Sequence, residues 1–120
     1  MAHLTMEYSG NLSDHFDARK VLFKLNEALL DTGEFEEDDV KSRALPLDTF
    51  LIGTTLGERA FIHLKLTIPA EHAPRLKREL SRKLLDVLQE IGSMPEFDVQ
   101  LCVEVRENDP ESYSKENLRI

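Results

Sequence analysis

The first eight residues carry the clearest candidate for chemistry in the chain. From Met1 to Tyr8, apolar and polar side chains alternate, which is typical of a half-buried strand. No charged or apolar leader precedes the strand, so we expect no signal peptide. If Met1 is removed, the α-amine of Ala2 becomes a positioned base. Its reference pKa of about 8 suits general-base work at neutral pH. The alternative is that the stretch is an ordinary first strand and nothing more.

Composition limits the partners that we expect. The chain has 120 residues, enough for one domain, and a formal net charge of −8. An acidic balance argues against nucleic acid or an anionic membrane surface as the main partner. No apolar run approaches the roughly 20 residues that span a bilayer. We therefore expect a soluble, cytoplasmic protein.

Cysteine and histidine usage gives no sign of a metal site. Cys102 is the single cysteine, so the chain has no internal disulfide and no cysteine metal cluster. The histidines show no metal-ligand spacing such as HExxH; they are His3, His15, His63 and His72. We therefore expect no metal.

In the first half, a helix and a second strand follow the opening strand. Ser13 and Asp14 are the candidate N-caps of a helix that runs to about Leu30 and stops at Gly33. Its main apolar face is accompanied by a second stripe on nearly the opposite side, formed by Phe16, Phe23 and Leu30. Either a loop or the C-terminal tail covers this stripe, or it is a subunit contact. The acidic run 34–39 is interpreted as a solvated loop, and 40–45 as a strand.

In the second half the same order recurs. Residues 60–68 form the strongest strand, Pro74 starts a helix that runs to about Ile91 and stops at Gly92, and 97–106 alternate as a last strand. From Asn108 the tail is polar. Its predicted anchors are Tyr113, Leu118 and Ile120.

The two halves overlay at an offset of 59 residues, which pairs Leu25 with Leu84 and Val40 with Val99. We therefore predict one α+β domain made of two β-α-β repeats, about 1–57 and 58–107, with a tail at 108–120. Right-handed crossovers put both helices on one face of a four-stranded sheet. The other face would carry polar side chains with Phe61 and Cys102 among them, and an oligomer could turn it inward, with Lys65 offsetting Glu7 or Glu104.

Four segments, in order, resemble the 5-carboxymethyl-2-hydroxymuconate isomerase family of the tautomerase superfamily. They are the opening Met-Ala-His-Leu-Thr-Met-Glu-Tyr-Ser, Leu29 to Phe35, Lys41-Ser42-Arg43, and Ala60 to Leu64. The resemblance implies a small homotrimer of duplicated β-α-β units that loses its initiator methionine. It implies an N-terminal proline as base, a conjugated oxo/hydroxy diacid from aromatic-compound breakdown as substrate, cationic side chains that hold the carboxylates, and no cofactor or metal.

The sequence departs from this pattern at its site. Ala2 occupies the proline position, and its nitrogen is a base only if Met1 is removed. A family arginine appears as Lys41, with Arg43 retained two residues on, and a second aligns with His72. Lysine lacks the bidentate fork, and histidine is cationic only at mildly acid pH. On their own, Lys41 and Arg43 could also be surface charges, and His72 a plain loop residue.

The resemblance thus predicts a cofactor-independent isomerase in which the Ala2 amine shuttles a proton on a carboxylated dienol, with low activity on the family's diacid. Lys41, Arg43 and His72 would bind the carboxylates. The alternative is a non-catalytic trimer of the same fold that binds an acidic metabolite or a protein partner.

Overall fold

Two β-α-β units form one mixed sheet in the computed structural model, which describes residues 1–70, 72–91 and 94–119. The first unit comprises β1 (Ala2–Ser9), α1 (Ala18–Asp31) and β2 (Val40–Leu47). The second comprises β3 (Arg59–Ile68), α2 (Pro74–Ile91) and β4 (Asp98–Glu107). Short 3-10 turns at Gly10–Leu12 and Glu37–Asp39 follow β1 and precede β2. The predicted α+β fold is confirmed.

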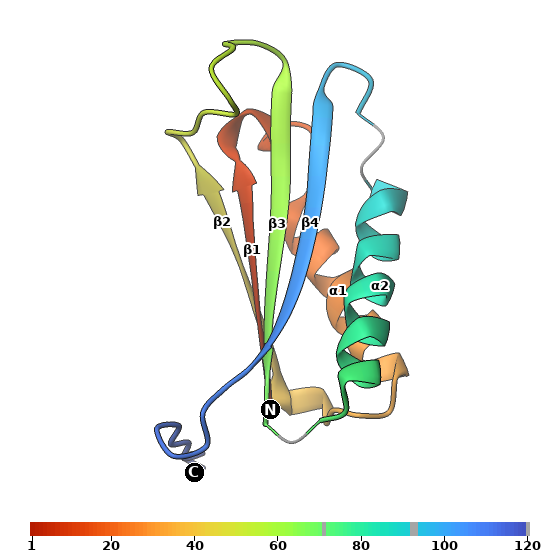
Figure 1. Cartoon of the computed structure of the whole chain (residues 1–120), viewed down its shortest axis with the longest axis vertical. Coiled ribbons are helices and arrows are strands. Elements are labelled where there is room, and N and C mark those ends of the chain that lie inside the picture. Colours follow the sequence, from red (N-terminus) through yellow and green to blue (C-terminus); the bar gives the residue numbers. More distant parts are fainter. Residues whose placement is uncertain (71, 92–93, 120) are drawn as a thin grey trace.

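The strand order is β2-β1-β3-β4. Each repeat pairs its own strands in parallel, β1 with β2 and β3 with β4, and the central strands β1 and β3 run antiparallel. Both helices lie on one side of this sheet (Figure 1). The chain start, the end of β3 and the start of β2 therefore meet at one end of the sheet, because His3 pairs with both Thr67 and Lys41.

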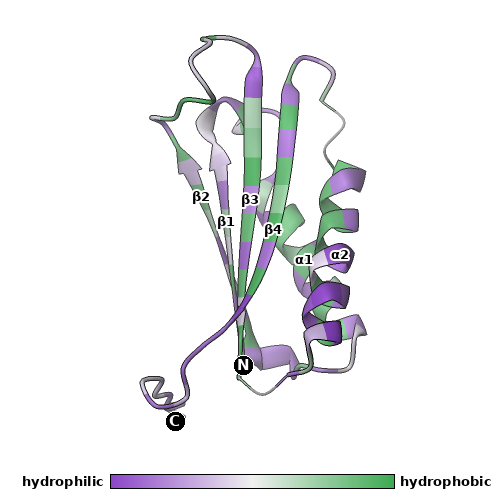
Figure 2. Ribbon diagram, viewed as in Figure 1, coloured by the Kyte–Doolittle hydropathy of each residue, from purple (hydrophilic) through white to green (hydrophobic). Residues whose placement is uncertain are grey.

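The core lies between the sheet and the helices. Every second residue of β1 and β3 is buried against α1 and α2, whose own buried leucines include Leu25, Leu29, Leu80, Leu84 and Leu88. Figure 2 shows the matching alternation of hydrophobic and hydrophilic residues along β3 and β4. The opposite, open face of the sheet is polar. On this face the Oε1 atom of Glu104 lies 3.2 Å from His63 Nε2 and 3.9 Å from Lys65 Nζ. Of the two acidic partners predicted for Lys65, Glu7 and Glu104, the structure thus pairs it with Glu104.

Local details correct several sequence predictions. The N-cap of α1 is Asp17, not Ser13 or Asp14, because Asp17 Oδ1 accepts hydrogen bonds from the backbone N–H groups of Arg19 and Lys20. Strand β2 continues through Pro46, since it is an edge strand and needs no donor on its outer side. Gly33 has φ +76°, as its predicted role at the helix end requires, whereas Gly92 lies outside the described residues.

The second apolar stripe predicted on the first helix is not continuous, and its first member, Phe16, precedes α1. Phe16 packs edge-on against Tyr8, and Leu30 packs against the core. Phe23 is 66% exposed, so neither a loop nor the tail covers it. In the tail, Tyr113 is anchored, but Leu118 is 92% exposed and its predicted anchoring is wrong; Ile120 lies outside the described residues. No helix in the described ranges is long and apolar enough to cross a membrane.

Candidate functional site

An open cavity of about 650 Å³ lies at the end of the sheet where the chain starts. The C-terminal tail reaches this end after leaving β4 (Figure 1). Three segments bring their side chains to the cavity: the start of β1, the turn that leads into β2, and the tail. The lining residues are His3, Glu36, Asp38, Asp39, Lys41, residues 113–117 and Arg119.

Strand register explains why these segments meet. In the parallel β1–β2 pair, Ala2 lies opposite Val40, His3 opposite Lys41, and Thr5 opposite Arg43. Side chains alternate along a strand, so Ala2 points into the core while the side chains of His3, Lys41 and Arg43 share the open face. Of the four predicted site residues, Lys41 lines the cavity, while Ala2 and Arg43 lie outside the lining, Ala2 next to His3 in the chain and Arg43 two residues beyond Lys41.

Arg43 does not line the cavity, but it is hydrogen-bonded to His3, which does. Its Nη2 atom is 3.2 Å from His3 Nδ1, and His3 Nε2 is 3.0 Å from the hydroxyl oxygen of Tyr113. Arginine can only donate, so His3 Nδ1 accepts, and the remaining ring proton sits on Nε2 and is donated to Tyr113. Partial burial lowers the pKa of His3, and the positive charges of Arg43 and Lys41 lower it further. His3 is therefore a neutral spacer between the arginine and the tail.

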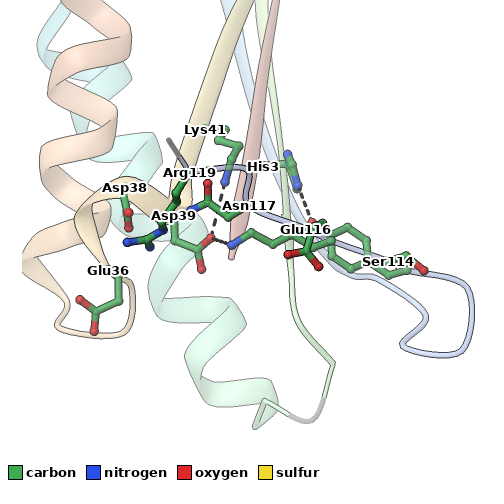
Figure 3. Close-up of a pocket in the computed structure, with 11 residues that line it drawn as sticks. His3, Glu36, Asp38, Asp39, Lys41, Ser114, Glu116, Asn117 and Arg119 are labelled. Atoms are coloured by element: carbon green, nitrogen blue, oxygen red, sulfur yellow. Dashed lines mark hydrogen bonds and ion pairs between the residues drawn. The ribbon is translucent and has the colours of Figure 1, made fainter.

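Asp39 is the centre of the charge network (Figure 3). Its Oδ2 atom forms an ion pair with the Met1 amine, and its Oδ1 atom contacts the ammonium groups of Lys115 and, at 3.5 Å, Lys41. The hydrogen bonds from Lys115 and then from the Met1 amine hold the pKa of Asp39 well below its ordinary range. The same contact raises the pKa of Lys115.

Met1 is held in place by contacts with Asp39 and Asn108. Its side chain is only 10% exposed, and its Sδ atom lies 3.7 Å from the side-chain nitrogen of Asn108. With Met1 in place, the nitrogen of Ala2 is an amide and has no basic lone pair. The N-terminal segment therefore offers an amine at residue 2 only after Met1 is removed.

His72 lies in the connector between β3 and α2, half-buried, and is not part of the cavity lining. It is at the same end of the sheet, because the end of β3 pairs with the start of β1. Its binding role stays a prediction. In the described ranges, no three His, Cys, Asp or Glu side chains gather in a way that could hold a metal ion.

The family model for 5-carboxymethyl-2-hydroxymuconate isomerase matches residues 2–120. The chain belongs to this family. The resemblance predicted from four short segments is thereby confirmed over nearly the whole chain. No curated protein sequence matches the chain.

Solved structures agree with the isomerase-family assignment. A 5-carboxymethyl-2-hydroxymuconate isomerase from Deinococcus radiodurans R1 is 28% identical, with a TM-score of 0.88 over 98% of this chain and 90% of that one. A 5-carboxymethyl-2-hydroxymuconate delta-isomerase is 20% identical, with a TM-score of 0.84 over 98% and 88%. A member of the cis-3-chloroacrylic acid dehalogenase family is 19% identical, with a TM-score of 0.69 over 94% and 79%. The last two matches show a shared fold.

The sequence did not single out Asp39, which contacts three cationic groups in the candidate site. Asp39 belongs to the acidic run that was interpreted as a solvated loop, and the rest of that run is largely exposed. One signal was present: Asp39 immediately precedes the strand that pairs with β1, so a parallel pairing puts it beside the N-terminus. The contacts of Tyr113 and Lys115 had no such signal, because the path of a polar tail does not follow from periodicity.

Proposed function

We propose that the protein is a cofactor-independent, cytoplasmic isomerase of the tautomerase type that acts on a carboxylated dienol from aromatic-compound breakdown. Membership of the family over residues 2–120 is one support. The observation that carries the proposal is the shared carboxylate of Asp39, which contacts both the N-terminal amine and Lys41. The N-terminus and the ammonium group of Lys41, a cation of the kind that binds carboxylates, therefore lie at the same cavity.

The proposed reaction is a proton shift. After Met1 is removed, the neutral Ala2 amine accepts the hydroxyl proton of the dienol, whose oxygen electrons become a dienolate. The resulting ammonium returns that proton to a carbon of the conjugated chain and leaves a carbonyl, so no atom is gained or lost. Lys41 and Arg43, with His72 from the neighbouring connector, would neutralise substrate carboxylates and stabilise the negative charge that develops.

The open face of the sheet supports a homotrimer as the working form. A four-stranded sheet covered by helices on one side leaves a broad face that carries His63, Lys65, Cys102 and Glu104, all at least partly accessible in the single chain. Closed symmetric oligomers bury such faces, and a neighbouring subunit would then complete the wall of the cavity.

A non-catalytic binding protein is the second candidate, and one observation favours it. The Met1 amine is ion-paired with Asp39 while the nitrogen of Ala2 is an amide. If the mature protein keeps Met1, the cavity has cations for an acidic metabolite but no base at residue 2.

The direct test of the base is Ala2→Pro, made in protein whose intact mass shows that Met1 is absent. Proline is accommodated at the first residue of a strand, so this change should not disturb β1. General-base catalysis typically contributes about 10²- to 10⁴-fold to a rate. Restoring the family's secondary amine is therefore expected to raise the rate of dienol ketonisation by roughly tenfold or more. Activity of the unchanged protein on the family's diacid is expected to be low. An unchanged rate in Ala2→Pro with Met1 absent would count against the amine mechanism.

A further inference from the structure

The hydroxyl group of Tyr113 lies at the cavity and forms a hydrogen bond with β1. Tyr113 lines the cavity from the tail, and its hydroxyl oxygen is 3.0 Å from His3 Nε2. Among the residues that the structure describes, no other group is hydrogen-bonded to this hydroxyl. The direction of the bond to His3 therefore decides whether the proton of Tyr113 is used within the protein or is left for a ligand.

Arg43 determines that direction. A guanidinium can only donate, so its contact of 3.2 Å makes His3 Nδ1 an acceptor. A neutral imidazole that accepts at Nδ1 carries its proton on Nε2, and Nε2 then donates to the oxygen of Tyr113. Because the oxygen of Tyr113 accepts in this bond, its own O–H proton has no acceptor among the described protein groups. A ligand in the cavity can accept it.

These three groups form a chain of hydrogen bonds that starts at a fixed positive charge. Arg43 donates to His3, and His3 donates to Tyr113 (Figure 3 shows the second bond). Hydrogen bonds in series polarise one another, so a hydroxyl whose oxygen accepts such a bond becomes a stronger donor. Burial lowers the pKa of His3, and so do the charges of Arg43 and Lys41, which keeps the ring neutral. The rings of His3 and Tyr113 also pack edge-on, with their centroids 6.1 Å apart.

A donor of this kind suits an anionic oxygen. The cavity lining carries both acidic and basic side chains, Asp39 and Lys41 among them, so its overall charge does not by itself select an anion. A hydrogen-bond donor held in a fixed position does, because it stabilises negative charge at one point. In the proposed reaction, the oxygen of the dienol becomes negative when its proton moves to the amine of residue 2. His3 follows that residue directly, so the donor and the amine lie at the same end of the sheet.

We infer that Tyr113 is a catalytic residue that donates a hydrogen bond to the anionic oxygen of the dienolate, and that His3 and Arg43 are positioning residues that orient and strengthen this donor. The inference rests on the proposed function for the identity of the oxygen. Tyr113 keeps its proton throughout, so the proton shift between the amine and the carbon is unchanged.

A matched pair of ligands isolates this hydrogen bond. The ligands 4-hydroxy-3-nitrophenylacetate and 3-nitrophenylacetate share a ring, a nitro group and a carboxylate. Only the first has a phenol, and the measurement is made at a pH where this phenol is ionised. Titration calorimetry of the unchanged protein is expected to show tighter binding of the phenolate. Tyr113→Phe keeps the ring and removes the hydroxyl, so it is expected to weaken phenolate binding about tenfold and to leave 3-nitrophenylacetate binding unchanged.

Two further variants separate the hydrogen bond from a general effect on the tail, and the readout is the ratio of the two affinities. Ser114→Ala is the matched control, because it removes a hydroxyl from the adjacent cavity-lining residue, and the ratio is expected to stay the same. Arg43→Met removes the first donor of the chain, so the ratio is expected to fall although Arg43 does not line the cavity. Loss of a carboxylate contact of Arg43 would weaken both ligands alike and would not change the ratio.

Several results would overturn the inference. They are an unchanged ratio in Tyr113→Phe or in Arg43→Met, an equal loss of both affinities in Tyr113→Phe, a fall in Ser114→Ala as large as in Tyr113→Phe, and no binding of either ligand. The expected changes in ratio without any dienol ketonisation would refute the proposed function and leave the hydrogen-bond assignment standing. Ketonisation with an unchanged ratio in Tyr113→Phe would do the reverse.

Discussion

His3 illustrates how single residues at this site fix one another's protonation. Its ring lies between a donor that never loses its proton, Arg43, and the hydroxyl of Tyr113. Protonation of Nδ1 would place a second positive hydrogen against the guanidinium. The neutral ring therefore holds Arg43 in place without adding charge, and it ties the tail to β1.

Arg43→Gln is expected to raise the pKa of His3 toward its ordinary value of 6.5, because one of the charges that lower it is removed while burial remains. Nitrogen-15 NMR of the imidazole across pH 4.5–8 measures this and also reports the tautomer. We expect Nε2 to carry the proton in the unchanged protein. An identical titration of His3 in Arg43→Gln, or a proton on Nδ1 at neutral pH, would contradict the described network.

A consequence for stability follows from the same pKa. Because folding lowers the pKa of His3, the unfolded chain takes up the proton first as the pH falls below 6.5. The contribution of His3 to stability is thus present above that pH and is lost as the pH falls through the folded pKa. The corresponding loss for Asp39, whose pKa is depressed from 3.8, begins at a lower pH.

At the scale of elements, the site is a product of parallel pairing between β1 and β2. Pairing in this register puts residues 39, 41 and 43 beside residues 1–5 without any contribution from the helices. The helices have a different role: they bury the opposite faces of the strands and so fix which side chains can turn toward the cavity. The alternation of β1 and β3 was readable in the sequence, whereas the start of α1 was not.

The start of α1 gives a test of this correction. Asp17→Ala removes the side-chain acceptor for two backbone N–H groups and is expected to cost about 1 kcal/mol in the free energy of unfolding. Asp14→Ala removes the cap suggested by sequence and is expected to change it by less than about 0.5 kcal/mol. Urea unfolding monitored by circular dichroism compares the two. A larger loss in Asp14→Ala would mean that the helix begins earlier.

For the whole molecule, periodicity and the internal offset of 59 residues were enough to predict four strands, two helices and one covered sheet face. Those features depend on hydrophobic burial, which leaves a regular pattern in the sequence. The site depends on which polar groups meet across the β1–β2 edge and the tail, and no period records such meetings. This is why Lys41 and Arg43 were predicted as site residues only through the resemblance and Tyr113 only as an anchor of the tail, whereas the contacts of Asp39 and Lys115 emerged from the structure.

The open face of the sheet, opposite both helices, is the candidate contact surface between subunits. We expect light scattering with size exclusion to give three times the 13.8 kDa chain mass at micromolar concentration. Cys102→Arg, at an exposed position on the open face of β4, is expected to dissociate the trimer. Gln89→Arg, on an exposed position of α2, is expected to leave it intact. A monomeric mass for the unchanged protein would end the trimer proposal.

The central claim is that the amine of residue 2 is the reactive group, and the most direct measurement is the ketonisation rate of two proteins that differ only in Met1. A cleavable fusion can release the chain starting at either Met1 or Ala2, with the start verified by intact mass. Because Met1 converts the Ala2 nitrogen to an amide and its own amine is paired with Asp39, we predict at least about a hundredfold faster ketonisation of a carboxylated dienol by the Ala2 form. Equal rates for the two forms would contradict the account.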